Sequence, residues 1–289
     1  MSKVVVIGGS GFLGSHVSDS LSASGNEVVV FDKFTSKWTN ENQEMFIGDI
    51  LNPEELNQCI EGADYVYNFA GIADINESSE QPLKTAELNI IGNLNVLEAC
   101  RGNEVKRIIY ASSVYVHSEE GGFYRCSKES SESYIRQFNK TFGLDYTILQ
   151  YGSLYGPRSD PTNGLRKIVE SALTEDTIRY IGDPEAIRSY IHVLDAAESS
   201  VEVLSEDFKN KTLILSGQES MKVKDLLEMV GEVIGNSKPI EFLSEEGTGH
   251  YIRTPYSYKE NLSRTFVPNS HIDLGQGLIH VIKELRNKE

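Results

Sequence analysis

The chain lacks the features that mark several specialised classes of protein. It has three cysteines and one tryptophan in 289 residues, and it contains no run of about 18 apolar residues that could span a membrane. Cys59, Cys100 and Cys126 show no CxxC spacing, which predicts reduced thiols rather than a disulfide framework. The six histidines form no ligand-like cluster with them. We therefore expect no membrane-spanning helix and no metal site.

Positive charge is also scarce, because 27 basic residues stand against 43 acidic ones and the formal net charge is −16. Such a chain should repel a polyphosphate backbone, so we expect no nucleic-acid partner. A small phosphate-bearing ligand remains compatible with this charge, since backbone amides and one or two arginines can form a local positive site. The N-terminal string MSKVVVIGGSG has no signal-peptide pattern, which predicts a cytoplasmic protein.

Short apolar runs that alternate with helical patterns fill the first half of the chain. Continuous apolar strands separated by helices are typical of a parallel sheet covered on both faces. We therefore predict an α/β fold with a doubly wound, Rossmann-type parallel sheet over residues 1–156. The expected strands are residues 3–8, 27–32, 63–71, 106–113 and 144–152, and the expected helices include residues 12–25, 53–62 and 82–102.

The regular alternation ends after residue 156. Strand-like runs remain at residues 177–182, 212–217 and 239–244, but the loops between them are longer and rich in Gly, Ser and Pro. This pattern predicts a smaller mixed lobe over residues 157–289 that binds the substrate. We expect some of its segments to return to the main sheet.

The string GGSGFLG indicates where a dinucleotide would bind. It places Gly8, Gly11 and Gly14 directly after the first strand and at the opening of the first helix. The first two glycines let the backbone turn tightly and approach a pyrophosphate at the helix N-terminus, and the third lets the helix pack against the sheet. Phe12 and Leu13 belong to the same loop, so all five residues are predicted to bind the cofactor.

An acidic residue downstream supports this interpretation. The second strand ends at Asp32, about twenty residues after the glycine loop, where an acid hydrogen-bonds the adenosine ribose. Lys33 follows, but no arginine that would bind a 2′-phosphate does, so we expect NAD rather than NADP. Asp49 and Ile50, at the end of the short run FIGDI, are predicted to contact the adenine. For Asp49, a place in a solvated loop is an equally open interpretation.

A serine, a tyrosine and a lysine form the predicted catalytic group. Tyr124 and Lys128 are four residues apart, so both fall on one face of a helix. They follow a strand that ends in Ser112 and Ser113, one short loop earlier. A nearby ammonium favours the phenolate form of tyrosine, and a serine hydroxyl can hold a substrate alcohol while its proton leaves. The arrangement predicts hydride transfer between an alcohol and a nicotinamide cofactor.

Together these motifs resemble the extended short-chain dehydrogenase/reductases. The strings GGSGFLG, NFAG, LNIIGNLNVLEAC, YASS and YRCSK occur in the order of that family. Two later strings, LQYGSLYGPR and RSYIHVLDAAES, are similar to its nucleotide-sugar branch, the NAD-dependent epimerase/dehydratases of the UDP-glucose 4-epimerase type. The resemblance covers nearly the whole chain.

The resemblance implies roles for the residues that match. Ser113, rather than Ser112, would be the catalytic hydroxyl, and Tyr124 would be the base. Lys128 would lower the pKa of the tyrosine and hold the nicotinamide ribose. Ser113 and Tyr124 would also contact the substrate. The remaining matched positions are Phe69, Ala70 and Gly71, which would line the cofactor path, and Asn89, which would support the site or serve ordinary packing.

The resemblance also implies how the substrate and a second subunit bind. Arg188 and Arg253 would grip the diphosphate of a sugar nucleotide, because a guanidinium binds phosphate with two parallel hydrogen bonds. Ordinary surface arginines are the alternative interpretation. The helices that contain Asn89 and Tyr124 would form a homodimer.

These observations favour an NAD-dependent nucleotide-sugar epimerase that acts through a transient 4-keto sugar. A nucleotide-sugar reductase or dehydrogenase needs the same groups and is the main alternative. A 4,6-dehydratase is disfavoured, because the family's added acid and base are replaced here by Val114 and Tyr115. A dinucleotide-binding sensor without chemistry is less favoured still, since it would not need Tyr124 and Lys128 beside a strand-end serine.

Overall fold

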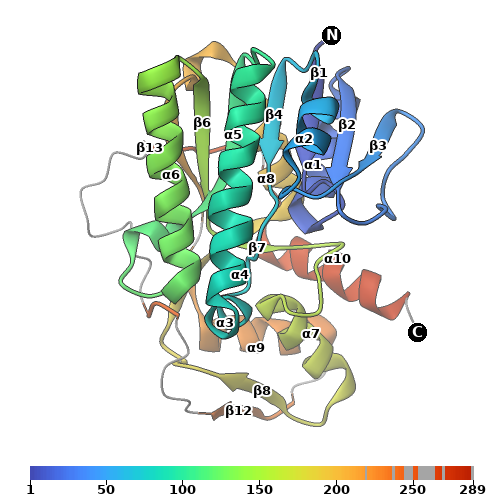
Figure 1. Cartoon of the computed structure of the whole chain (residues 1–289). Coiled ribbons are helices and arrows are strands. Elements are labelled where there is room, and N and C mark those ends of the chain that lie inside the picture. The colour runs from blue at the N-terminus through green and yellow to red at the C-terminus, as the bar shows by residue number, and fades with distance from the viewer. Residues whose placement is uncertain (219, 236–237, 244–249, 253–263, 269–270, 288–289) are drawn as a thin grey trace.

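The structure is a computed structural model and describes residues 1–218, 220–235, 238–243, 250–252, 264–268 and 271–287. In this part of the chain, eight strands form one sheet in the order β13-β10-β6-β5-β4-β1-β2-β3, and every neighbouring pair is parallel. The predicted doubly wound α/β fold is thereby confirmed (Figure 1). The strands are β1 (Lys3–Ile7), β2 (Glu27–Asp32), β3 (Gln43–Ile47), β4 (Tyr65–Asn68), β5 (Arg107–Ser113), β6 (Asp145–Tyr151), β10 (Lys211–Leu215) and β13 (Arg264–Thr265).

The strand order reverses at β1, and this reversal places the site. β1 pairs with β2 on one side and with β4 on the other, so the chain leaves β1 in one direction and returns on the opposite side. Ligands of open α/β sheets bind in the crevice outside the carboxyl ends of the strands at such a reversal. The loops after Ile7 and Asn68 meet there, where the Phe69 amide donates to the Ile7 carbonyl at 2.8 Å.

Two layers of helices cover the sheet because the apolar strand residues alternate between its faces. Val4 and Val6 of β1 belong to the core against α1 (Phe12–Ala23) and α8 (Val193–Glu202). Val5 and Ile7 belong to the core on the other face. That face is covered by α2 (Pro53–Ile60), α5 (Gly92–Gly102) and α6 (Gly122–Phe142), and Figure 1 shows α5 and α6 side by side in front of the sheet.

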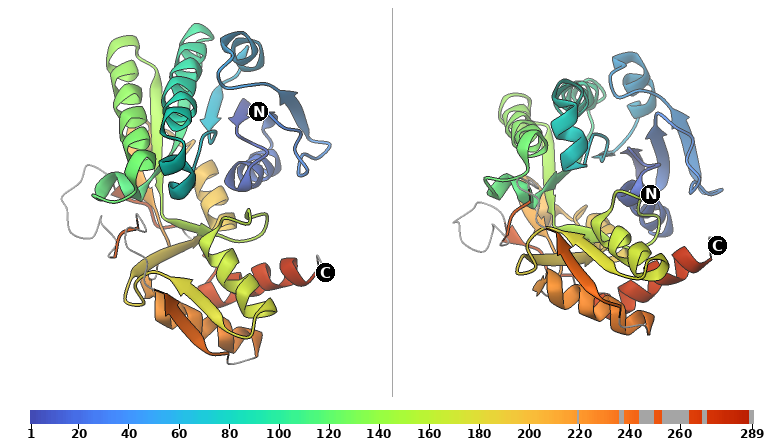
Figure 2. Two further views of the ribbon diagram at one scale, coloured as in Figure 1. Left: turned by 60° about the horizontal axis from the view of Figure 1, so that its bottom comes forward. Right: turned by 90° about the horizontal axis from the view of Figure 1, so that it is seen from below.

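A smaller lobe lies below the main sheet in Figure 1 and is seen from two further sides in Figure 2. It has its own apolar core, in which Val169, Leu226 and Leu278 from three helices are buried. Its strands are β7 (Ser153–Tyr155), β9 (Ile187–His192) and β11 (Ser220–Lys222) in one sheet, and β8 (Ile178–Ile181) and β12 (Ile240–Leu243) in another. Its helices are α7 (Gly164–Thr174), α9 (Val223–Ile234) and α10 (Leu274–Arg286).

Segments that follow residue 156 also belong to the main body of the protein, among them α8, β10 and β13. β10 pairs with β6 in the large sheet, and α8 packs against α1. Conversely, β7 precedes residue 156 and pairs with β9 of the smaller lobe. Residue 156 therefore does not separate the two lobes cleanly. The assignment of cofactor binding to residues 1–156 and of substrate binding to residues 157–289 stays a prediction.

The region expected to form one helix over residues 82–102 is divided. It consists of α4 (Pro82–Ala86), a π-helical turn η1 (Glu87–Ile91) and α5, preceded by α3 (Ile75–Glu80). Asn89 lies in the π turn, accepts from the amide of Ile72 at 2.8 Å and donates to Ser127 Oγ at 2.9 Å. A π turn widens the helix locally and is frequent at functional sites. Here it presents the Asn89 side chain to two neighbouring segments.

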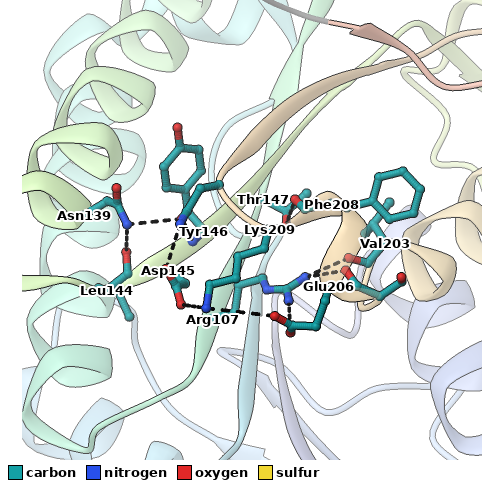
Figure 3. A network of polar contacts seen from close by, with 12 residues as sticks. Arg107, Asn139, Leu144, Asp145, Tyr146, Thr147, Val203, Glu206, Phe208 and Lys209 are labelled. Carbon is teal, nitrogen blue, oxygen red and sulfur yellow. Dashed lines mark hydrogen bonds and ion pairs between the residues drawn. The ribbon is translucent and has the colours of Figure 1, made fainter.

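A polar network ties the segment after α8 to the amino end of the sheet (Figure 3). Arg107, at the start of β5, is 1% exposed and donates to the carbonyl oxygens of Val203 and Ser205, each at 3.0 Å. It also forms an ion pair with Glu206 in η3 (Glu206–Phe208) at 2.6 Å. The network lies at the end of β5 opposite to Ser113, so it anchors the sheet without entering the site.

Several classes of feature are missing from the part of the chain that the structure describes. No helix there is both long and apolar enough to cross a membrane. No three His, Cys, Asp or Glu side chains in the same residues are grouped so that they could hold a metal ion. Cys59 and Cys100 are buried thiols and Cys126 is an exposed one.

Candidate active site

The glycine loop turns tightly between β1 and α1. Gly8 adopts φ of +76°, and a Cβ at this position would lie 2.6 Å from the backbone nitrogen of Ala70. A Cβ at Gly14 would overlap the carbonyl oxygen of Gly8. Both positions therefore require glycine for close approach of backbone to backbone. Phe12 and Leu13 form the first turn of α1, with Leu13 buried.

The first turn of α1 is suited to a negatively charged group. Gly11 is its N-cap, no side chain caps the helix, and no acidic residue lies in the first turn. The Asp32 carboxylate stands beside it and accepts from the Ser10 amide at 3.0 Å. These three residues line an open depression together with Phe34 and Trp38. The depression extends from the helix N-terminus to the carboxylate, as the adenosine half of a dinucleotide would require.

The two predicted adenine-side residues are already held by other groups. Asp49 forms an ion pair with Lys33 at 2.8 Å, and the hydrogen bond from Lys33 lowers the pKa of Asp49. The same bond raises the pKa of Lys33. Ile50 is buried, and its carbonyl oxygen accepts from Asn95 at 3.2 Å. The charge of Lys33 is thus matched by a carboxylate rather than offered to a 2′-phosphate.

The segment after β4 forms the wall next to the glycine loop. Phe69 is half-buried, and the Ala70 amide donates to the Asn68 side chain at 3.2 Å. Gly71 adopts φ of +137°, and a Cβ there would overlap the Asn89 amide oxygen. Because glycine has no Cβ, the backbone at Gly71 can approach the Asn89 side chain of the π turn closely.

The structure brings the predicted serine, tyrosine and lysine together. Ser113 ends β5, and its hydroxyl lies close enough to the hydroxyl of Tyr124, near the start of α6, to lower the pKa of that tyrosine. Lys128 lies one turn further along α6, with Nζ 5.8 Å from the centre of the Tyr124 ring. It donates to the Ala111 carbonyl at 2.7 Å and lies over the Tyr110 ring. All three predicted groups are at least nine-tenths buried.

Burial dominates the ionisation of this group in the free protein. It raises the pKa of Tyr124 above its ordinary value, while the hydrogen bond from Ser113 acts in the opposite direction. Burial also lowers the pKa of Lys128 to about 8, against the charge of Glu132, which raises it. The sequence predicts that Tyr124 is a phenolate near neutral pH. Because burial opposes this form in the free protein, it requires positive charge in addition to that of Lys128.

Arg188, one of the two predicted diphosphate ligands, lies in β9 and is 8% exposed. Its Cζ is 4.5 Å from the centre of the Tyr251 ring. The Tyr251 ring packs on Tyr115, whose hydroxyl is 2.6 Å from His250 Nδ1. Tyr115 in turn packs edge-on against Tyr124, with ring centres 6.2 Å apart. A chain of aromatic contacts therefore links the arginine to the predicted base.

Sequence reasoning missed residues that contact this group from distant parts of the chain. Arg253, the second predicted diphosphate ligand, lies outside the described residues. Tyr115 and His250 were not predicted as site residues, although Tyr115 lies only two positions after Ser113. Glu132 and Gln150 were also missed, and only the position of Glu132 one turn after the lysine signals a contact.

The residues present fit a dinucleotide. The glycine loop forms a cradle that any Cβ would fill, the adjacent helix N-terminus is uncapped by side chains, and Asp32 is half-exposed at the end of β2. A model of the NAD-dependent epimerase/dehydratase family matches residues 4–215.

The chain belongs to the NAD-dependent epimerase/dehydratase family. A UDP-N-acetylglucosamine 4-epimerase from Methanobrevibacter ruminantium, solved in complex with UDP-N-acetylmuramic acid, is 25% identical with a TM-score of 0.88 and covers 100% of this chain and 99% of that chain. A UDP-glucose 4-epimerase from Thermotoga maritima, solved with UDP-glucose, is 25% identical with a TM-score of 0.86, with 99% of each chain covered. The UDP-glucuronic acid decarboxylase 1 of Arabidopsis thaliana is 26% identical over 99% of this chain and 70% of its own length.

Membership in the epimerase/dehydratase family confirms three predictions from the sequence. The resemblance to extended short-chain dehydrogenase/reductases is correct, the protein is an NAD-dependent enzyme of the nucleotide-sugar epimerase type, and its cofactor is NAD. The assignment of individual residues to catalysis and binding stays a prediction, which the geometry above makes specific.

Proposed function

We propose that this enzyme inverts carbon 4 of a UDP-linked sugar through a transient 4-keto sugar. The observation that carries the proposal is the burial of Ser113, Tyr124 and Lys128 in one group, at the end of β5 and the start of α6, with Lys128 Nζ 5.8 Å from the centre of the Tyr124 ring. The two UDP-sugar 4-epimerases that share this fold at 25% identity support the choice of UDP and of carbon 4.

NAD, which the glycine loop and Asp32 would hold, would supply the hydride acceptor and donor for carbon 4 of the sugar. Tyr124 takes the proton of the 4-hydroxyl as the carbon–oxygen double bond forms, and it gives the proton back when the alcohol is restored. Ser113 holds the same oxygen by a hydrogen bond from the other side. Lys128 keeps the phenolate form of Tyr124 accessible by its positive charge.

Arg188 would bind the diphosphate of the substrate. Its Cζ lies 4.5 Å from the centre of the Tyr251 ring, and its Nη1 donates to the Ile187 carbonyl at 3.1 Å, so the guanidinium is held by a ring and by a backbone carbonyl. The contacts from Tyr251 through Tyr115 to Tyr124 connect the arginine to the proposed base, which supports a role for it in binding the substrate. Arg253 would be the second phosphate ligand, as the sequence predicts.

The surroundings of Ser113 argue against dehydration. Val114 is buried and apolar in η2 (Val114–His117), and the Tyr115 hydroxyl is engaged by His250. Neither residue can act as the acid and base that expel water from a 4-keto intermediate. A reductase or dehydrogenase would use the same three groups and is the alternative that the experiment must separate.

The experiment is incubation of the purified enzyme and NAD with UDP-glucose, UDP-N-acetylglucosamine and UDP-glucuronate in turn, with products identified by NMR. Conversion to the 4-epimer without net change in NADH supports the proposal. Stoichiometric NADH formation would assign a dehydrogenase instead, and loss of carbon dioxide from the glucuronate would assign a decarboxylase.

We also propose that the enzyme is a homodimer through the face of η1 and α6. Ile91, Tyr134 and Phe142 are each close to half exposed on these elements, so they could be covered by a partner subunit. A symmetric contact would cover the same patch on both subunits. Sedimentation should give twice the chain mass, and Ile91→Glu should shift it toward the monomer. A cytoplasmic location stays a prediction from the sequence.

A further inference from the structure

Glu132 is a buried carboxylate that lies one turn beyond Lys128 on α6. It is 4% exposed, and positions four apart share one face of a helix. Its Oε1 accepts from Ser112 Oγ at 2.6 Å and from Gln150 Nε2 at 2.9 Å. Its Oε2 accepts from Arg136 at 2.5 Å. Three donors from α6, β5 and β6 thus converge on one carboxylate beneath the predicted catalytic group.

The orientation of the Gln150 amide is itself fixed. His117 Nε2 lies 2.8 Å from Gln150 Oε1, and an amide oxygen can only accept, so His117 carries its proton on Nε2. The amide nitrogen of Gln150 is therefore turned toward Glu132. This arrangement holds the carboxylate in one position without adding a charge to it.

The charges around Glu132 are unevenly distributed. Ser112 and Gln150 are neutral, so they orient the carboxylate but leave its charge in place. Among the residues that the structure describes, Arg136 is the one cation that forms an ion pair with Glu132, and its side chain is 40% exposed, so water screens its charge. Lys128 and Glu132 are 6% and 4% exposed, so water screens the interaction between their charges less than it screens Arg136.

Lys128 needs a compensating negative charge in its surroundings. A buried ammonium is disfavoured unless an opposite charge lies near it. Its other neighbours are the Ala111 carbonyl and the neutral rings of Tyr110 and Tyr124. Glu132 is the carboxylate that raises the pKa of this lysine against its burial.

We propose that Glu132 is a positioning residue for catalysis, because it supplies the counter-charge that keeps Lys128 an ammonium, and that Ser112 and Gln150 hold its carboxylate for this task. The inference rests on the role of Lys128 in the proposed function. If Glu132 has this role, removing its charge changes the pKa of Lys128. That pKa can be measured whether or not the enzyme turns over a substrate.

The test compares two substitutions that should act with opposite signs. Glu132→Gln keeps the shape and removes the negative charge, so the pKa of Lys128 should fall by about one unit. Arg136→Gln removes the cation that offsets Glu132, so the pKa of Lys128 should rise by a smaller amount. The readout is NMR titration of isotope-labelled lysine in the whole enzyme, with the Lys128 signal assigned by its loss in Lys128→Met.

Two controls separate the charge from the packing. Ser112→Ala disturbs the same network without changing its charge, and Glu129→Gln removes a carboxylate from the neighbouring, half-exposed position of α6. Neither should reproduce the shift of Glu132→Gln. If Glu132→Gln does not fold, Arg136→Gln at the exposed end decides, because an unchanged Lys128 pKa in that variant would overturn the proposal.

The kinetic readout distinguishes this inference from the proposed function. In an active epimerase, the basic limb of the pH profile of kcat/KM should move down in Glu132→Gln and up in Arg136→Gln. Wild-type enzyme that turns over no UDP-sugar would refute the proposed function while the NMR titration still tests Glu132. A folded Glu132→Gln protein with an unchanged Lys128 pKa would refute the role of Glu132 alone.

Discussion

Ser112 and Ser113 are consecutive residues of β5 whose hydroxyls point to opposite partners. Ser113 lies beside the hydroxyl of Tyr124 and lowers its pKa, whereas Ser112 donates to the buried carboxylate of Glu132 at 2.6 Å. Successive side chains of a strand point to opposite faces, so only one of the two can reach a substrate above Tyr124. The alternation gives neighbouring serines different tasks.

We expect Ser113→Ala to lower kcat by roughly 10–100-fold, which corresponds to losing a hydrogen bond of about 1.5–3 kcal/mol to a charged group. Steady-state kinetics on the substrate found by the UDP-sugar panel measures this loss. Ser112→Ala is the matched comparison and should cost less. Equal losses in both variants would mean that Ser113 does not hold the substrate oxygen.

Tyr124→Phe keeps the ring and deletes the acid/base hydroxyl. General acid–base catalysis is worth roughly 10²–10⁴-fold, so turnover should fall by about that factor. NAD affinity, measured by fluorescence titration, should stay nearly the same, because the phenyl ring preserves the packing against Tyr115. Unchanged turnover would show that another group moves the proton.

Asp49→Asn should improve binding of NADP relative to NAD. It removes the carboxylate that pairs with Lys33 at 2.8 Å and leaves the lysine available for a 2′-phosphate. Because this ion pair is exposed, the change should be only a few-fold. Asp32→Ala should narrow the preference for NAD more strongly, since a carboxylate at the ribose repels that phosphate. Calorimetric titration with both cofactors measures these ratios, and equal affinities in the unmodified enzyme would contradict the assignment of Asp32.

Arg188→Ala should raise the dissociation constant of the UDP-sugar by the loss of about 1.5–3 kcal/mol of charge-assisted binding. Arg188→Lys should restore only part of it, because an ammonium lacks the planar pair of donors. Arg179→Ala removes an exposed arginine of the same lobe and is the control. NAD affinity should stay constant in all three variants, and a loss shared by Arg179→Ala would argue against a specific phosphate site.

The enzyme should lose stability as the pH falls from about 6.5 to 4. Burial, followed by the nearby charges of His280 and His16, lowers the pKa of His192 to about 4. The unfolded chain binds a proton near 6.5, so stability from this group is complete above that pH and is lost as the pH falls toward 4, by at most about 3 kcal/mol. His192→Asn keeps an acceptor at the N-cap of α8 and should flatten the pH dependence of chemical denaturation. An equally steep dependence in this variant would place the acid sensitivity elsewhere.

The strands of the main sheet were predictable because each is a short apolar run between turn signals. Residues 27–32 form β2 as expected, and β1, β5 and β6 differ from their predicted ranges only at the ends. Burial on both faces of a parallel sheet is what makes these runs continuous and therefore visible in the sequence. The glycine loop was predictable for a similar reason, since its backbone conformation admits few other residues.

Other parts of the site depend on contacts that no local pattern records. The π turn at Asn89 arises from hydrogen bonds to Ile72 and Ser127, and the residues of such a turn look like any other helix. His250 reaches Tyr115 from far along the chain. The separation of these partners in sequence is why spacing arguments missed the aromatic contacts near the base.

The position of β10 has a consequence for how the protein folds during synthesis. β6 pairs with β5 on one edge, and its other edge is covered by β10, which is made only after β7, α7, β8 and β9 of the smaller lobe. Until then β6 exposes unpaired backbone groups, and α1 lacks the helix α8 that packs on it. Pairings between distant segments form slowly because the intervening chain must first be ordered. The nucleotide-binding half therefore cannot complete its structure as it leaves the ribosome, and a nascent chain that stops before β10 would be prone to aggregation.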